Sequence, residues 1–116
     1  MHEAGIARNI LDKIIEEADK HGGGRVKSVS LSIGTLTHIM DDALRFAFQA
    51  LAEGTCAEAS ALEIEHQPAD LTCRDCRWSG KSDGNKLRCG ACGGTNVDTS
   101  GGDEICLVSF KMETND

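Results

Sequence analysis

Four cysteines in two Cys-x-x-Cys pairs are the residues whose types and spacing imply chemistry most directly. Cys73 and Cys76 form the first pair, and Cys89 and Cys92 form the second pair after twelve intervening residues. Each pair can fold as a tight turn that presents two thiolates to one metal ion, and Zn²⁺ prefers such ligands at about 2.3 Å. The segment has few apolar side chains for a core of its own, so bound zinc would supply much of its folding free energy.

Disulfide bonds and a redox pair are the alternatives for these cysteines. Disulfides require an oxidising compartment, and nothing near the N-terminus resembles a secretory signal. A thioredoxin-like motif has one Cys-x-x-Cys within a βαβ pattern, not two in a glycine-rich segment. We therefore predict structural Zn(II) bound by all four thiols. The separate Cys56 and Cys106 are interpreted as small buried residues, and the sequence assigns no functional role to either.

The charge of the chain argues against nucleic acid as a partner. The 116 residues carry a net charge of −7, and residues 69–103, which contain the cysteine pairs, hold five acidic and five basic residues. Nucleic-acid-binding zinc modules usually present a basic field to phosphate. We interpret Arg74, Arg77 and Arg88 instead as charges that offset the thiolates. No apolar run reaches transmembrane length, so we expect a cytoplasmic protein without a membrane partner.

The first three residues form a second candidate site. A chain that begins Met-His is expected to keep its first methionine, because removal normally demands a small second residue. The amine of Met1, the backbone nitrogen and imidazole of His2 and the backbone nitrogen of Glu3 could then surround one ion in a plane. Chelation through deprotonated amides favours Ni²⁺ or Cu²⁺. From these residues alone, a terminal histidine without a function remains the alternative.

Hydrophobic periodicity predicts the elements that must position these sites. Apolar residues at steps of three and four predict a helix ended by the glycines from Gly22, and a second helix from Asp41, its N-cap, to Gly54. In this second helix Phe46 is predicted to flank the buried stripe. Alternating apolar residues predict strands over 25–33, 61–67 and 104–112, with a short strand at 96–99.

These elements predict an α+β fold, with two helices covering one face of a small sheet. Pro68 marks a natural border, so we predict one domain from residues 1–68 plus 104–116 and an inserted domain over 69–103. The sequence contains no paired carboxylates near a histidine, no nucleophile–base spacing and no phosphate-cradling glycine loop. We therefore expect that the protein is not an enzyme.

Several short motifs occur along the chain in a fixed order. They are Met1-His2-Glu3, an isoleucine-rich helix ending in His21-Gly22, Ser32-Ile33-Gly34, Ala43-Leu-Arg-Phe-Ala-Phe48, Gly54-Thr55, Leu62-Glu-Ile-Glu65, Gln67-Pro68-Ala69 and the two Cys-x-x-Cys pairs. Together they resemble the HypA/HybF family of hydrogenase maturation nickel metallochaperones over essentially the whole chain.

The resemblance implies a nickel domain of two helices on a small mixed β-sheet, with a zinc-ribbon-like domain inserted before the last strand. It implies that Met1, His2 and Glu3 bind Ni(II) as cargo, and that the partners are a HypB-type GTPase and the large-subunit precursor of a [NiFe]-hydrogenase. No histidine follows Leu71, which favours a fixed all-thiolate zinc site and disfavours service to urease. The sequence leaves open self-association, the hydrogenase served, and whether His38 or His66 approaches nickel.

Overall fold

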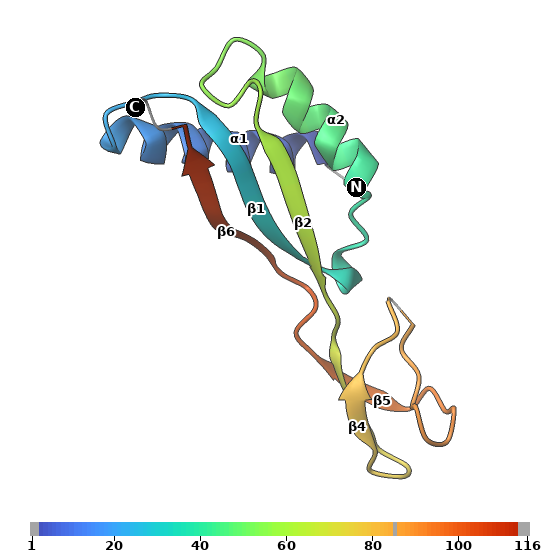
Figure 1. The fold of residues 1–116 in the computed structure, drawn as a ribbon. Coiled ribbons are helices and arrows are strands. Elements are labelled where there is room, and N and C mark those ends of the chain that lie inside the picture. Colours follow the sequence, from blue (N-terminus) through green and yellow to red (C-terminus); the bar gives the residue numbers. More distant parts are fainter. Residues whose placement is uncertain (1–2, 85, 114–116) are drawn as a thin grey trace. The chain divides into compact units, whose positions relative to one another are not determined.

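The computed structural model describes residues 3–84 and 86–113, and Figure 1 shows their arrangement as a ribbon. Within these residues the elements follow one another as α1 (Glu3–Lys20), β1 (Val26–Gly34), the 3-10 helix η1 (Thr35–Thr37), α2 (Asp41–Ala52), β2 (Ala61–Gln67), β3 (Asp70–Cys73), β4 (Ser79–Lys81), β5 (Val97–Ser100) and β6 (Ile105–Met112). The strands form two three-stranded sheets, in the orders β2-β1-β6 and β4-β3-β5.

The first sheet is mixed, because Figure 1 shows β1 and β2 running in one direction and β6 in the other. The helices α1 and α2 lie together on one face of this sheet (Figure 1), and they pack against each other. The observed architecture is therefore the predicted α+β fold, with two helices on a small mixed sheet and a second, all-β sheet.

The chain divides into two compact units, each of which is described by itself. The first unit is Met1–Leu31, Ile39–Glu65 and Leu107–Asp116, and the second is Ser32–His38 and His66–Cys106. The functional division into a nickel domain and a zinc domain with borders at Pro68 and Asp103 stays a prediction.

Helix α1 forms where the three- and four-residue spacing predicted it. Its inward face consists of five buried side chains: Ala7, Ile10, Leu11, Ile14 and Ala18. The helix ends in a turn around Gly22, which has a φ of 89°, and the Gly23 N–H donates to the Ala18 carbonyl at 2.9 Å. A left-handed residue at this position lets the last carbonyls of a helix find donors, and glycine adopts it without steric cost.

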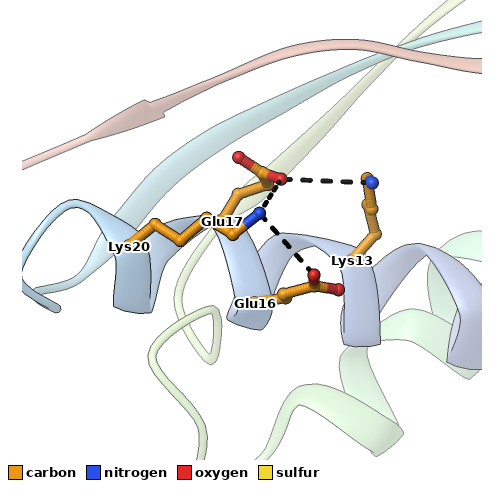
Figure 2. A network of polar contacts seen from close by, with 4 residues as sticks. All are labelled: Lys13, Glu16, Glu17 and Lys20. Atoms are coloured by element: carbon orange, nitrogen blue, oxygen red, sulfur yellow. Dashed lines mark hydrogen bonds and ion pairs between the residues drawn. The ribbon is translucent and has the colours of Figure 1, made fainter.

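The outward face of α1 carries a short network of ion pairs (Figure 2). Lys20 Nζ lies 3.4 Å from Glu17 Oε1 and 3.7 Å from Glu16 Oε1, and Lys13 Nζ lies 4.0 Å from the same Glu17 oxygen. Pairs at this spacing each stabilise an exposed helix by about 0.2–0.5 kcal/mol. The network therefore supports the solvent side of a helix whose stability comes mainly from its buried face.

Helix α2 buries Leu44, Phe48 and Ala52. Two details of the sequence prediction are wrong here. Met40, not Asp41, is the N-cap residue, and Asp41 is the first helical residue. Phe46 does not flank the buried stripe closely, because its side chain is 75% exposed. Among the described residues, neither helix combines the length and apolar character needed to cross a membrane.

The strands confirm one predicted burial pattern and correct another. In β1, Val29, Leu31 and Ile33 are buried as their alternation predicted. In β6, Cys106 is exposed and Val108 is 63% exposed, so the prediction that Cys106 is buried is wrong. The alternation in β6 changes phase after Val108. Cys106 and Val108 are therefore exposed, whereas Phe110 and Met112 are half-buried. Cys56 is half-buried.

Candidate metal centre

The sheet β4-β3-β5 places the first cysteine of the cluster. Strand β3 pairs antiparallel with both neighbours, so that Leu71 lies opposite Gly80 on one side and Thr99 on the other. The Leu71 side chain is buried, and Cys73 ends the strand with its side chain on the same buried face. A strand paired on both sides fixes the position of Cys73 relative to the turn that follows.

The first Cys-x-x-Cys pair forms a tight turn closed by backbone hydrogen bonds. The Cys73 N–H donates to the Trp78 carbonyl at 2.7 Å, and the Arg77 N–H donates back to the Cys73 carbonyl at 3.0 Å. The Cys76 N–H points at the Cys73 Sγ atom, 3.4 Å away. A backbone N–H directed at sulfur stabilises a thiolate, so this turn is suited to an anionic ligand.

The second pair repeats the same turn. The Cys89 N–H donates to the Gly94 carbonyl at 2.8 Å, and the Gly93 N–H donates to the Cys89 carbonyl at 3.1 Å. The N–H groups of Ala91 and Cys92 both point at the Cys89 Sγ atom, each at 3.3 Å. Two turns with matching hydrogen bonds therefore present two sulfur atoms each.

The two turns bring the four predicted zinc ligands together. The Sγ atoms of Cys73, Cys76, Cys89 and Cys92 all lie within 4.8 Å of one another. Across the cluster, Cys73 Sγ lies 3.8 Å from Cys92 Sγ, and Cys76 Sγ lies 3.3 Å from Cys89 Sγ. A tetrahedron with metal–sulfur distances of about 2.3 Å has edges of about 3.8 Å, so the cluster has the size that zinc requires.

The ionisation of the cluster also suits a cation. Burial disfavours the Cys89 thiolate, but the N–H groups of Cys92 and Ala91 and the Cys76 thiol outweigh burial and lower the pKa of Cys89 to about 6. The Trp78 N–H favours the Cys76 thiolate, but the neighbouring Cys89 and burial raise the pKa of Cys76 to about 12. A divalent cation removes this conflict, because a coordinated thiol loses its proton.

Trp78 follows the first Cys-x-x-Cys turn, and its ring packs against Gly90 in the second turn. A Cβ atom added at Gly80 or Gly90 would lie well inside 3.0 Å of the Trp78 ring, so neither position has room for a side chain. Cys73 and Cys89 are buried, whereas Cys76 and Cys92 are exposed. The ring is the only tryptophan in the chain, which contains no tyrosine, so fluorescence reports on this cluster alone.

Replacing Arg77 by glycine is expected to raise the free energy of unfolding of the zinc-loaded protein by about 1 kcal/mol. Arg77 has a φ of 65°, and the equivalent residue of the second turn is Gly93 with a φ of 74°. The gain is the relief of this strain, and denaturant unfolding followed by Trp78 fluorescence measures it. Arg88→Gly, at an exposed residue without positive φ, is the control and should not stabilise. A loss of stability in Arg77→Gly would contradict the explanation.

The structure also identifies a partner that sequence reasoning missed. The Arg74 Nε–H donates to Asp98 Oδ1 at 2.8 Å, joining the first turn to β5. This hydrogen bond raises the pKa of Arg74 and lowers that of Asp98. Arg74 therefore pairs with a carboxylate in addition to lying beside the thiols. The two residues are far apart in sequence, and no local pattern links them.

The residues of the predicted nickel site are described only in part. Met1 and His2 lie outside the described residues. Glu3 begins α1, and its Oε2 atom accepts a hydrogen bond from the Met40 N–H at 3.3 Å. His38 is exposed with a φ of 58°, and His66 is exposed near the end of β2. The described part of this site is thus the start of α1, held at the N-terminus of α2.

Two solved structures share this fold. The structure called "Solution structure of HypA protein" superposes with a TM-score of 0.67 at 25% identity, covering 97% of each chain. The solution structure of the Ni metallochaperone HypA from Helicobacter pylori gives a TM-score of 0.66 at 24% identity, covering 99% of this chain and 100% of that chain. At 24% identity, the likeness to the Helicobacter pylori protein shows the fold alone.

Sequence comparison establishes the family. Hydrogenase maturation factor HypA of Geotalea daltonii is 40% identical over 105 residues, which cover 90% of this chain and 93% of that protein. Hydrogenase maturation factor HybF of Salmonella typhimurium is 31% identical, over 97% of this chain and 100% of the relative. The family model described as "Hydrogenase/urease nickel incorporation, metallochaperone, hypA" matches residues 1–112. The chain, with its mixed sheet, two helices and cluster of four thiols, therefore belongs to the HypA family of nickel-incorporation metallochaperones.

Proposed function

We propose that this protein binds Ni(II) at its N-terminus and delivers it to the large-subunit precursor of a [NiFe]-hydrogenase. The observation that carries the proposal is the family match, which begins at residue 1 and so includes Met1, His2 and Glu3. The relatives in Geotalea and Salmonella are named as hydrogenase maturation factors. This agreement supports a hydrogenase precursor as the acceptor of the metal.

The chemistry of the first three residues suits nickel as cargo. The Met1 amine, the His2 amide and imidazole and the Glu3 amide supply four nitrogen ligands in one plane, a field that Ni²⁺ accepts and Zn²⁺ does not prefer. The amides lose protons when they bind, so nickel binding releases protons and weakens as the pH falls. A micromolar affinity, about −8 kcal/mol, holds the ion during transfer without trapping it.

The four cysteines hold Zn(II) in a structural role. The cluster has the size of a tetrahedral site, and the backbone N–H groups around Cys89 already favour the thiolate form. With all four positions filled by protein sulfur, such a site leaves no open position for a substrate. We infer that the zinc shapes the second unit and that the protein acts as a carrier, not as an enzyme. Its partners are the precursor and a HypB-type GTPase.

Isothermal titration of Ni²⁺ into the untagged, zinc-loaded protein tests the proposal. Wild type should bind one Ni²⁺ ion with micromolar affinity, and this binding should be lost in His2→Ala, which removes the imidazole. It should also be lost when extra residues precede Met1, because the amine ligand then moves away. The matched control is His21→Ala, at an exposed histidine after the end of α1, which should leave the affinity unchanged.

Equal nickel affinities in wild type, His2→Ala and the extended protein would refute nickel binding at the N-terminus. If none of the three proteins binds nickel, the result would favour a second candidate, a zinc-stabilised interaction module without nickel, for which the thiol cluster alone is sufficient. An effect of His21→Ala as large as that of His2→Ala would likewise count against the proposed site.

A further inference from the structure

The outer face of α2 exposes apolar side chains that no neighbouring element covers among the described residues. Ala43, Phe46 and Ala50 recur at positions i, i+3 and i+7, and we call them the outer α2 face. All three are exposed, and Phe46 is 75% exposed. At 100° per residue, Phe46 projects opposite the buried Leu44 and Phe48, so it cannot reach the core by a change of rotamer. The Phe46 side chain therefore adds little to packing, and Ala43 and Ala50 extend its exposed apolar surface along the helix, so that the three form a patch rather than a single exposed residue.

The outer α2 face begins beside the described part of the nickel site. Met40, the N-cap residue of α2, is 66% exposed, and its N–H donates to the Glu3 carboxylate at 3.3 Å. At about 1.5 Å per residue, Phe46 lies only about 9 Å along the helix from Met40. A protein that covers Phe46 is therefore within reach of the start of α1.

The charges beside the face define the chemistry of its partner. Asp42 and the C-cap residue Glu53 are both exposed, and at 100° per residue their positions lie within about 40° of Phe46. Acidic side chains beside an aromatic residue complement a pocket with a basic rim. The helix thus offers an aromatic anchor with negative charge at either end.

We propose that the outer α2 face is the docking surface for the protein that accepts the nickel, and that this acceptor presents an apolar groove rimmed by lysine or arginine. The inference rests on the proposed function, since it assigns the partner of the same N-terminal site. A helix that inserts spaced apolar residues into a groove is a common mode of recognition, and buried aromatic residues dominate the energy of such interfaces. Docking at this place brings the acceptor to the metal.

The substitution Phe46→Asp tests this docking surface. It removes the aromatic anchor and places a charge in the groove, so the affinity for the purified, nickel-free large-subunit precursor should fall about 30-fold or more. Because the side chain is exposed, the variant should keep the circular dichroism spectrum of wild type, and its nickel affinity should stay within about twofold of wild type. The matched control is Val108→Asp, at an exposed apolar residue of β6, which should leave precursor binding unchanged.

Equal precursor affinities in wild type and Phe46→Asp overturn the proposal, and so does the absence of any binding by wild type. A wild-type dimer that Phe46→Asp converts to a monomer, with precursor binding intact, assigns the face to a second copy and also overturns it. The proposal is also overturned if Phe46→Asp loses its binding to the HypB-type GTPase but keeps its binding to the precursor. Should wild type bind no nickel, the proposed function fails, but the comparison of precursor affinities still decides the docking surface.

Discussion

Removal of zinc by a chelator is expected to unfold the second unit while the helices of the first unit keep their circular dichroism signal. Among the described residues of the second unit, the buried hydrophobic side chains are Ile33, Ala69, Leu71, Cys73 and Cys89, and two of these five are thiols of the cluster. So small a core cannot offset the entropy of ordering the chain. A structural zinc site contributes about 10–16 kcal/mol, which exceeds what the remaining contacts supply.

Trp78 fluorescence and far-ultraviolet circular dichroism separate the two units in this experiment. Trp78 lies in the second unit between Gly80 and Gly90, whereas α1 and α2 lie in the first. Cys73→Ser should reproduce the effect of the chelator, because it removes a ligand and leaves a buried polar group. Cys106→Ser, at an exposed thiol outside the cluster, is the control and should behave as wild type. Unchanged Trp78 emission after complete removal of zinc would contradict a structural role for the metal.

Local periodicity was sufficient to predict the larger elements of the fold. The spacing of apolar residues located α1, and alternation located β1, β2 and β6 to within a residue or two. Strand β4 has the sequence Ser79-Gly80-Lys81, which contains no apolar alternation, and its extended form comes from pairing with β3. A short strand of this kind is determined by its neighbour and is not visible in its own residues.

Burial was harder to predict than secondary structure. The apolar pattern predicted that Phe46 flanks the buried stripe of α2 and that Cys106 is buried in β6, yet the structure exposes both side chains. Periodicity shows which residues share a face of a helix or strand, but whether another element covers that face depends on the tertiary arrangement. The exposure of Phe46, on which the proposed docking surface rests, is therefore visible only in the structure.

The two candidate sites differ in how far the sequence determines them. The four thiols were predicted from spacing alone, since a tight turn imposes the geometry of each pair, and the structure brings them together. The pairing of Arg74 with Asp98 depends on the approach of β5 to the first turn and has no local signature. The nickel ligands Met1 and His2 rest on coordination chemistry and on the family, and they stay a prediction.

The substitution Gly34→Ala is expected to lower the free energy of unfolding by about 3 kcal/mol. Gly34 ends β1, where its N–H donates to the Glu104 carbonyl and the Leu36 N–H donates to the Gly102 carbonyl, both at 2.8 Å. An added Cβ atom would lie well inside 3.0 Å of that same Gly102 carbonyl, which the hydrogen bond from Leu36 holds in place. Since backbone atoms cannot rotate away as a side chain does, the clash must separate the two segments.

The backbone conformation of Gly34 makes this test specific for the contact. Its φ of −69° and ψ of 138° are favourable for alanine, so any loss of stability comes from crowding against Gly102 and not from a strained conformation. Gly5→Ala is the control, because nothing lies within 4 Å of the added carbon and alanine should stabilise α1 by about 1 kcal/mol. Denaturant unfolding of the zinc-loaded proteins measures both, followed by Trp78 fluorescence for Gly34→Ala in the second unit and by far-ultraviolet circular dichroism for Gly5→Ala in α1. A neutral Gly34→Ala would mean that Ser32–His38 does not pack against residues 102–104 and would contradict its place in the second unit.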